Sequence, residues 1–184
     1  MPRVWAWRGS VSISRDETAR AEASAGGASV TSPARERMSH TYARNAIHVV
    51  FSTKDRRRTI SAEFQPKMWA YSAGICKKQG IFVHAIGGME DHVHFLIQVP
   101  PTMALAKAVL AIKSNSSRWA NEGGHKLAWQ QGYAAFSVSA SIVPAVVRYI
   151  QNQEARHRKM SFDEEFLALL RKHGVEFDPK FVFG

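Results

Sequence analysis

Two short strand-like segments, set between two longer helical stretches, constrain the fold of this chain more than any other feature. Residues 81–87 and 91–99 are apolar and β-branched, and Gly87-Gly88 predicts a turn between them. The stretch before this pair, residues 61–79, and the stretch after it, residues 102–121, are predicted to be helices. The pattern therefore indicates an antiparallel hairpin with a helix on either side in sequence.

The flanking segments complete a recognisable order of elements. Residues 45–53 predict a strand before the first helix, and residues 127–138 predict a bent strand after the second. The order β-α-β-β-α-β is that of the ferredoxin-like, split βαβ arrangement, an α+β fold with an antiparallel sheet and two helices on one face. Two more helices follow, at 141–159 and about 162–173. The predicted helix ends are marked by Ser61, Gly80, Thr102, Gly123-Gly124, Ser141 and Gly174.

The first 37 residues differ from the rest of the chain. They are rich in Ser, Ala, Gly, Arg and Glu and show no sustained periodicity, so we predict a disordered N-terminal extension over 1–37. Met38 begins a segment that resembles a natural protein start. We therefore predict one folded domain over 38–184.

The charge balance indicates the class of partner. The chain has 25 Lys and Arg against 15 Asp and Glu, a formal net charge of +10. Such a balance favours a polyanion, nucleic acid before a membrane surface. A single cysteine excludes an internal disulfide and fits a reducing cytoplasm, where we expect the protein to be located. No run is long and apolar enough to cross a membrane.

His92-Val93-His94, within the second strand of the hairpin, is the strongest candidate for a metal site. Side chains alternate across a strand, so both imidazoles leave one face while Val93 points to the other. Two imidazoles form part of a facial metal site with open positions. Structural histidines are the competing interpretation. Glu90 and Asp91 are interpreted as turn or supporting residues, and core packing is the favoured role for His48.

The predicted helix at 141–159 offers a nucleophile and a further ligand. Tyr149 and Gln153 are four residues apart, which places them on one helical face. A phenol is a poor nucleophile unless a nearby cation stabilises the phenolate, and a metal would do so. The alternative is a packed tyrosine ring with a surface glutamine. Cys76, in the middle of the first helix, has no reason to meet the histidines.

Basic and aromatic side chains frame these candidates. Arginine and lysine can contact phosphates, and aromatic rings can stack on bases. For any single cluster a solvated or core role is the simpler interpretation, but together with the net charge they indicate a nucleic-acid surface. The residues assigned to DNA are Arg56, Arg57, Arg58, Lys113, Arg118, Trp129, Tyr133, Arg156 and Arg158.

These motifs together resemble a known family. His92-Val93-His94 is similar to the His-hydrophobic-His signature of HUH endonucleases, and Tyr149 with Gln153 resembles the single-tyrosine transposases of bacterial insertion sequences. The runs from Trp129 to Tyr133 and from Phe136 to Ser139 resemble relatives associated with REP palindromes. The resemblance covers residues 38–184.

The resemblance implies a Mg²⁺- or Mn²⁺-dependent transposase that cleaves and rejoins single-stranded DNA bearing hairpins through a 5′-phosphotyrosine. Carried over by position, it implies that Tyr149 is the nucleophile and that His92, His94 and Gln153 hold the metal. It also implies a homodimer, with active sites shared between subunits in some relatives.

Two other functions compete with this hypothesis. The first is a domesticated, non-catalytic regulator of the same fold that binds DNA hairpins, which would not need the metal ligands. The second is a metal-dependent hydrolase that does not act on DNA. The net charge of +10 and the lack of a positioned carboxylate base argue against the hydrolase.

Overall fold

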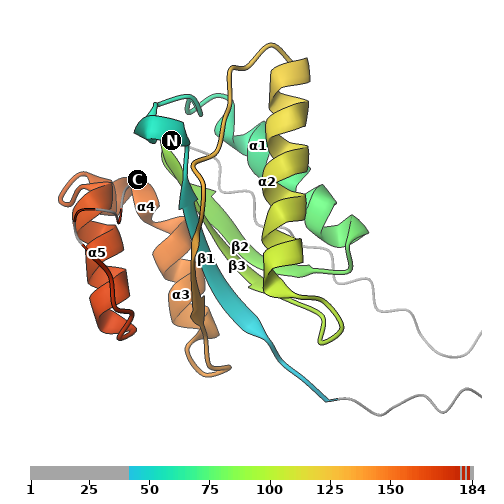
Figure 1. The fold of residues 1–184 in the computed structure, drawn as a ribbon, viewed down its shortest axis with the longest axis vertical. Helices are drawn as coiled ribbons and strands as arrows, with labels where there is room; N and C mark the ends of the chain where they lie inside the picture. Colours follow the sequence, from blue (N-terminus) through green and yellow to red (C-terminus); the bar gives the residue numbers. More distant parts are fainter. Residues whose placement is uncertain (1–41, 179, 181, 183–184) are drawn as a thin grey trace, which may run out of the picture. The chain divides into compact units, whose positions relative to one another are not determined.

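Four strands form one antiparallel sheet in the computed structural model of the protein, which describes residues 42–178, 180 and 182. The strands are β1 (Ala46–Ser52), β2 (Phe82–Gly88), β3 (His92–Gln98) and β4 (Ala134–Ser137), in the order β2-β3-β1-β4 (Figure 1). This order confirms the predicted ferredoxin-like sheet. The predicted extension at 1–37 lies outside the described residues.

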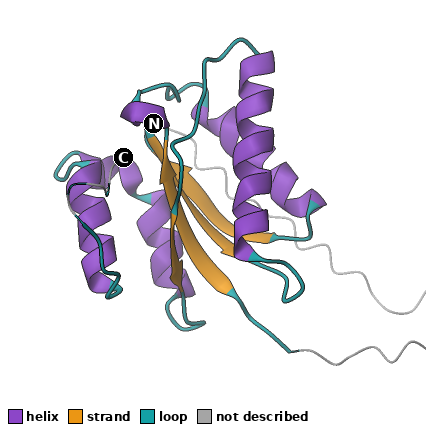
Figure 2. Cartoon of the chain, viewed as in Figure 1, coloured by secondary structure: helices purple, strands orange, loops and turns teal. Residues whose placement is uncertain are grey.

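One face of the sheet is covered by two long helices. These are α1 (Gln65–Lys78) and α2 (Leu105–Glu122), which lie on the same side of the strands in Figure 2. Alternate strand residues point towards them, because side chains alternate across a strand. The resulting core contains Val49, Phe51, Val93, Phe95, Ile97, Cys76, Ala108, Val109 and Ile112.

The opposite face is covered by the C-terminal helices. These are α3 (Val143–Gln151), α4 (Gln153–His157) and α5 (Phe162–Lys172). The alternate residues of β1 and β3 face them, including Val50, His94 and Leu96, while Val143, Ile150, Phe162 and Leu170 pack from the helices. Because both faces of β3 are covered, His92 to Ile97 are all buried. The histidines are therefore in the interior of the domain.

The predicted helix caps were wrong at three starts. Helices α1, α2 and α3 begin after Phe64, Ala104 and Ile142, and none has a side-chain cap. In α1 and α3 a proline occupies the first turn, where its missing N–H costs nothing. Ser61, Thr102 and Ser141 therefore precede the helices. The side-chain cap that does form belongs to α5, where Ser161 and Glu164 make a capping box.

The Gly87-Gly88 pair does not form the predicted turn. Both residues lie within β2, and the chain reverses after them, between β2 and β3. A Cβ on Gly87 would lie 2.5 Å from the Ile150 carbonyl oxygen, and one on Gly88 would lie 2.3 Å from the His92 oxygen. Gly87 thus lets α3 approach the sheet, and Gly88 lets β2 and β3 pack closely where the chain reverses. The predicted helix ends at Gly80 and Gly174 are confirmed, with φ of +71° and +63°.

Two predicted elements are shorter than expected. Of residues 127–138, only Ala134–Ser137 form a strand, and Trp129 makes an isolated bridge with Thr53. The predicted helix 141–159 is divided into α3 and α4 at Asn152, whose φ and ψ of −101° and 22° leave the helical range. None of the helices among the described residues is long and apolar enough to cross a membrane.

Candidate metal and nucleophile site

His92 and His94 lie side by side on the face of β3 that the C-terminal helices cover. Both side chains are fully buried, and their rings are 5.2 Å apart between centroids. In both residues Nε2 has no hydrogen-bond partner among the described residues. Buried nitrogens without a partner are rare, and a ligand or ion is a common explanation.

The other ring nitrogen of each histidine does have a partner. His92 Nδ1 lies 2.7 Å from Asp91 Oδ1, a carboxylate oxygen that can only accept, so Nδ1 carries the proton. His94 Nδ1 lies 3.0 Å from His48 Nε2. A metal-binding histidine commonly donates its second N–H to such a partner, which fixes the tautomer and the ring orientation. Asp91 therefore leaves the His92 Nε2 lone pair directed towards the interior, and the contact with His48 orients the ring of His94.

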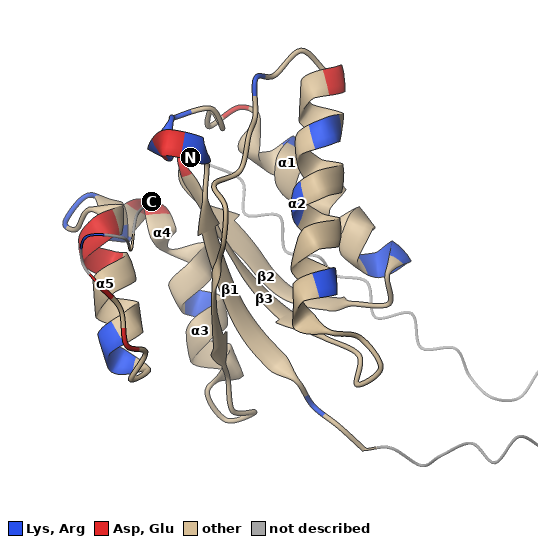
Figure 3. Cartoon of the chain, viewed as in Figure 1, with Lys and Arg blue, Asp and Glu red and all other residues tan. Residues whose placement is uncertain are grey.

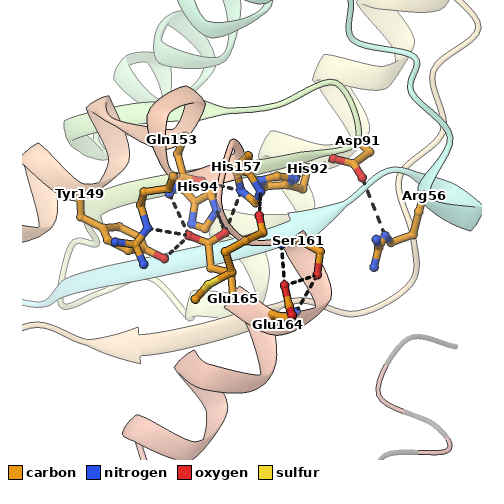
Figure 4. A network of polar contacts seen from close by, with 12 residues as sticks. Arg56, Asp91, His92, His94, Tyr149, Gln153, His157, Ser161, Glu164 and Glu165 are labelled. Carbon is orange, nitrogen blue, oxygen red and sulfur yellow. Dashed lines mark hydrogen bonds and ion pairs between the residues drawn. The ribbon is translucent and has the colours of Figure 1, made fainter.

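Tyr149 reaches the histidines from α3 of the same chain. Its ring centroid is 5.9 Å from that of His94 and 5.8 Å from that of His48. The phenol donates a short hydrogen bond to Glu165 Oε1, on α5, and the Arg156 guanidinium lies 4.4 Å from the phenol ring centroid. Figure 4 shows these side chains converging from β3, α3, α4 and α5. The structure thus brings the predicted nucleophile and the two predicted imidazoles together.

Gln153 is also buried at this site, but its amide groups bond to protein. Its Nε2 donates to Glu165 Oε1 at 3.1 Å, and its Oε1 lies 3.0 Å from His157 Nε2. The amide oxygen, the atom that the predicted ligand role requires, therefore faces His157. That role remains a prediction.

Burial governs the titration of this site. Desolvation lowers the pKa of His48 to about 3 and that of His94 to about 4, with neighbouring charges as secondary causes. Burial would by itself raise the pKa of Glu165, but contacts with His157, His94 and Tyr149 hold it far below its ordinary value. Desolvation and the Glu165 charge raise the pKa of Tyr149. The phenol is therefore protonated at neutral pH in the metal-free protein.

The low histidine pKa values predict acid sensitivity of the metal-free protein. Below the ordinary pKa of 6.5, both histidines are protonated in the unfolded chain, whereas buried His48 and His94 stay neutral in the folded protein. The free energy of unfolding therefore falls as the pH is lowered from about 6.5 towards 4. Each such proton contributes a slope of about 1.4 kcal/mol per pH unit. Urea unfolding in EDTA should show a shallower slope for His48→Gln than for the wild type; an equal slope would contradict this assignment.

Three buried ligand atoms could hold a metal ion. One atom each from His92, His94 and Glu165 lie within 4.8 Å of one another. The ligands of a facial set are mutually cis, so bonds of about 2.1 Å place their ligand atoms about 3 Å apart. Side-chain movements that shorten the separations would therefore be needed to bring the three atoms onto one ion. Two imidazoles and a carboxylate are a known facial donor set that leaves positions open for substrate.

Two pockets flank this polar cluster. One is lined by His92, His157 and Arg56, together with Arg58 and Asp91. The other is lined by His48 and Tyr149 and continues over apolar residues of α3. The pockets offer one approach to the imidazoles and a separate approach to the phenol.

Some of the residues assigned to DNA are exposed, and others make contacts within the protein. The exposed residues are Arg57, Arg58, Arg118, Tyr133, Arg156 and Arg158, of which Arg156 also contacts Tyr149 and Glu165. Figure 3 marks positions of Lys and Arg in blue on α2, α3 and α5 and around the segment that follows β1. Arg56 forms ion pairs with Asp91 and Asp163 and lies over the Phe162 ring.

Lys113 and Trp129 have structural contacts. Lys113 Nζ donates to the carbonyl oxygens of Gln130 and Gly132 at 2.6 and 2.7 Å. Trp129 Nε1 donates to Ser116 Oγ at 3.0 Å, and the indole packs against Phe51. Both residues hold the segment before β4 in place. Their predicted contacts with DNA would have to be made from these positions.

The sequence reasoning missed Glu165 and His157 and favoured only packing for His48. Glu165 had one available signal, since Phe162 and Leu169 are three and four residues from it and place it on the apolar stripe of α5. A lone carboxylate on such a stripe indicates a buried charge with partners. The predicted supporting role of Asp91 agrees with its hydrogen bond to His92.

Comparison with known proteins gives the family. A family model described as "Transposase IS200 like" matches residues 41–153. The transposase for insertion sequence element IS200 of Salmonella typhimurium is 25% identical over 80 residues, which cover 44% of this chain and 53% of that protein. The ISDra2 transposase TnpA of Deinococcus radiodurans is 25% identical over 119 residues, covering 58% and 81%. The chain spans about half the length of the IS200 relative.

Solved structures agree in fold. A transposase structure from Deinococcus radiodurans has a TM-score of 0.50 and 22% identity, over 62% of this chain and 95% of that one. A REP-associated tyrosine transposase bound to a REP hairpin has a TM-score of 0.50 and 15% identity, over 65% and 72%. The family match spans more than half of the 184 residues and includes both histidines, Tyr149 and Gln153. The protein therefore belongs to the IS200-like transposase family, as its resemblance to single-tyrosine transposases predicts.

Proposed function

We propose that the protein cleaves and rejoins single-stranded, hairpin-bearing DNA, with Tyr149 as the nucleophile and a divalent ion, Mg²⁺ or Mn²⁺, beside it. His92 and His94 would hold the ion through their ring nitrogens. The third ligand would be an oxygen from α4 or α5, and the sequence predicts that of Gln153 on α4. One observation carries the proposal: the phenol of Tyr149 and the Nε2 atoms of both histidines, which have no hydrogen-bond partner among the described residues, meet in one buried cluster. Family membership makes DNA the natural substrate.

The proposed reaction is a transesterification. The Tyr149 oxygen loses its proton and attacks the scissile phosphorus, a P–O bond to Tyr149 forms, and the P–O3′ bond breaks. The departing oxygen takes up a proton and becomes a free 3′-hydroxyl. The phosphate stays esterified to the 5′ oxygen of the next nucleotide. Attack by a 3′-hydroxyl on the phosphotyrosine reverses the step and restores the phenol, so rejoining needs no other energy source.

The electrostatics of the site explain why this chemistry needs a cation. Burial and the Glu165 charge raise the pKa of Tyr149, so phenolate formation is unfavourable as the protein stands. A bound divalent ion would polarise the scissile phosphate and stabilise negative charge on the phenol oxygen. The Arg156 guanidinium, stacked on the phenol ring, acts in the same direction.

The DNA is proposed to be single-stranded with a hairpin. Exposed arginines at positions 57, 58 and 158 are suited to its phosphates. The structural neighbour bound to a REP hairpin supports this substrate class by its shared fold. The predicted homodimer stays a prediction. Tyr149 approaches the histidines of its own chain, so the proposed site does not require a tyrosine from a second subunit.

A labelled hairpin substrate tests the proposal. Single-stranded hairpin DNA labelled on the 3′ side of the cleavage position, incubated with Mn²⁺, is expected to give a protein–DNA adduct that survives denaturing electrophoresis. EDTA should prevent the adduct, and fully duplex DNA should give none. Cleavage without any adduct would indicate hydrolysis, and hairpin binding that is insensitive to chelator and yields no cleavage would indicate the regulator; either result would overturn the proposal.

A further inference from the structure

Glu165 sits between the proposed nucleophile and the proposed metal site, although it lies outside the segment that defines the family. The family match ends at residue 153, and Glu165 belongs to the first turn of α5. The capping box of Ser161 and Glu164 fixes that turn. The side chain is 2% exposed, so its charge is held inside the domain.

The two carboxylate oxygens of Glu165 face different partners. Oε1 accepts the hydrogen bonds of the Tyr149 hydroxyl and of Gln153 Nε2. Oε2 accepts none from the described residues and lies 3.5 Å from His94 Nε2 and 3.0 Å from His157 Nε2. One oxygen is thus committed to the nucleophile, and the other is directed at the histidines.

Three buried polar atoms of this cluster therefore lack a hydrogen-bond partner among the described residues, and one ligand atom from each of the three residues lies within 4.8 Å of the others. The three atoms without a partner there are His92 Nε2, His94 Nε2 and Glu165 Oε2. Leaving several such atoms unsatisfied in the interior is costly, and a cation between them would satisfy all three at once. The amide oxygen of Gln153, by contrast, faces His157.

We propose that Glu165 is the third metal ligand through Oε2 and, through Oε1, the residue that positions Tyr149 against the metal. This inference rests on the proposed function and names a ligand from α5 in place of Gln153. Gln153 then acts by holding the carboxylate through its Nε2. A single carboxylate would thus set the distance between the nucleophile and the ion that binds the scissile phosphate.

The same geometry allows a rival role for Glu165. Its carboxylate lies 3.5 Å from the Arg156 Nε and close to His94 and His157, so it could occupy the place of the substrate phosphate and block the site. His92 Nε2 favours the ligand role, because its lone pair would stay unsatisfied beside a blocking anion and would be satisfied by a cation. Removing a blocking group would raise activity, whereas removing a ligand would weaken metal binding.

Metal binding without DNA tests the proposal. Mn²⁺ titrations followed by electron paramagnetic resonance should show Glu165→Gln binding at least about tenfold more weakly than the wild type. Glu165→Asp, which keeps the charge, should recover part of the affinity. Glu154→Gln, which removes an exposed carboxylate of α4, should bind as the wild type does. Gln153→Ala should lose less affinity than Glu165→Gln; circular dichroism confirms that each variant is folded.

The position of the nucleophile needs a second readout. With 3-fluorotyrosine in place of the four tyrosines, Mn²⁺ should selectively broaden the ¹⁹F resonance that Tyr149→Phe removes, and the broadening should be lost in Glu165→Ala. Unchanged Mn²⁺ affinity in Glu165→Gln, or a greater loss in Gln153→Ala, would overturn the ligand role. If the wild type forms the DNA adduct but Glu165→Gln binds Mn²⁺ as tightly as the wild type, the ligand role fails and the proposed function stands. If Glu165→Gln binds Mn²⁺ more weakly but the wild type forms no adduct, the ligand role stands and the proposed function fails.

Discussion

Tyr149→Phe is expected to abolish the covalent protein–DNA adduct while leaving the fold and the binding of hairpin DNA intact. The change removes only the phenol oxygen, which is the proposed attacking atom, and no other tyrosine lies against His94 among the described residues. A nucleophilic step without its nucleophile should fall by more than about a thousandfold, to the level of background. Denaturing gels of the labelled adduct measure this directly, and filter binding of the same DNA measures affinity.

The matched control is Tyr71→Phe. Tyr71 lies on α1, across the sheet, and stacks on Trp119 with 4.3 Å between ring centroids. Its variant should form the adduct at the rate of the wild type. An adduct that persists in Tyr149→Phe would assign the nucleophile to another residue and would remove the basis for a phosphotyrosine mechanism.

The strand alternation of His92-Val93-His94 made half of the site predictable. Local chemistry sets which way these side chains point, so the two imidazoles could be placed on one face before any packing was known. The same rule, applied to β1, places His48 beside His94 once the strands are paired, because Val50 lies opposite His94 and His48 points to the same face two residues away. The pairing register is a long-range property that the local sequence does not reveal. A core role was therefore the simpler interpretation of His48.

The apolar stripe of α5 includes Glu165, but local chemistry alone did not assign this residue to the site. It follows Asp163 and Glu164, and three acidic residues in a first turn are the ordinary composition of a helix start. Only the packing of α5 against the sheet decides that Glu165 is buried, since Phe162 and Leu170 contact Val50 and Phe136. Position within a helix is local, but the choice of buried face depends on distant strands.

Gly87→Ala is expected to destabilise the domain and to disturb the nucleophile at the same time. The new Cβ would lie 2.5 Å from the Ile150 carbonyl oxygen and 3.0 Å from its Cγ2, and α3 or β2 must move to relieve this contact. Overpacking of this kind costs about 1–3 kcal/mol of unfolding free energy. Ile150 follows Tyr149 directly, so the shift should also lower the rate of adduct formation. Urea unfolding and the adduct assay measure the two effects.

Gly74→Ala is the matched control for Gly87→Ala, and it is expected to raise the stability of the domain rather than lower it. Gly74 lies within α1, and a Cβ there would meet no described heavy atom within 4 Å. Alanine in a helix interior is favoured over glycine by about 0.5–1 kcal/mol, so this variant should be slightly more stable and should form adduct normally. If Gly87→Ala were as stable and active as Gly74→Ala, the close approach of α3 to β2 would not be required. Tyr149 would then be held by its contact with Glu165 rather than by the packing of its helix.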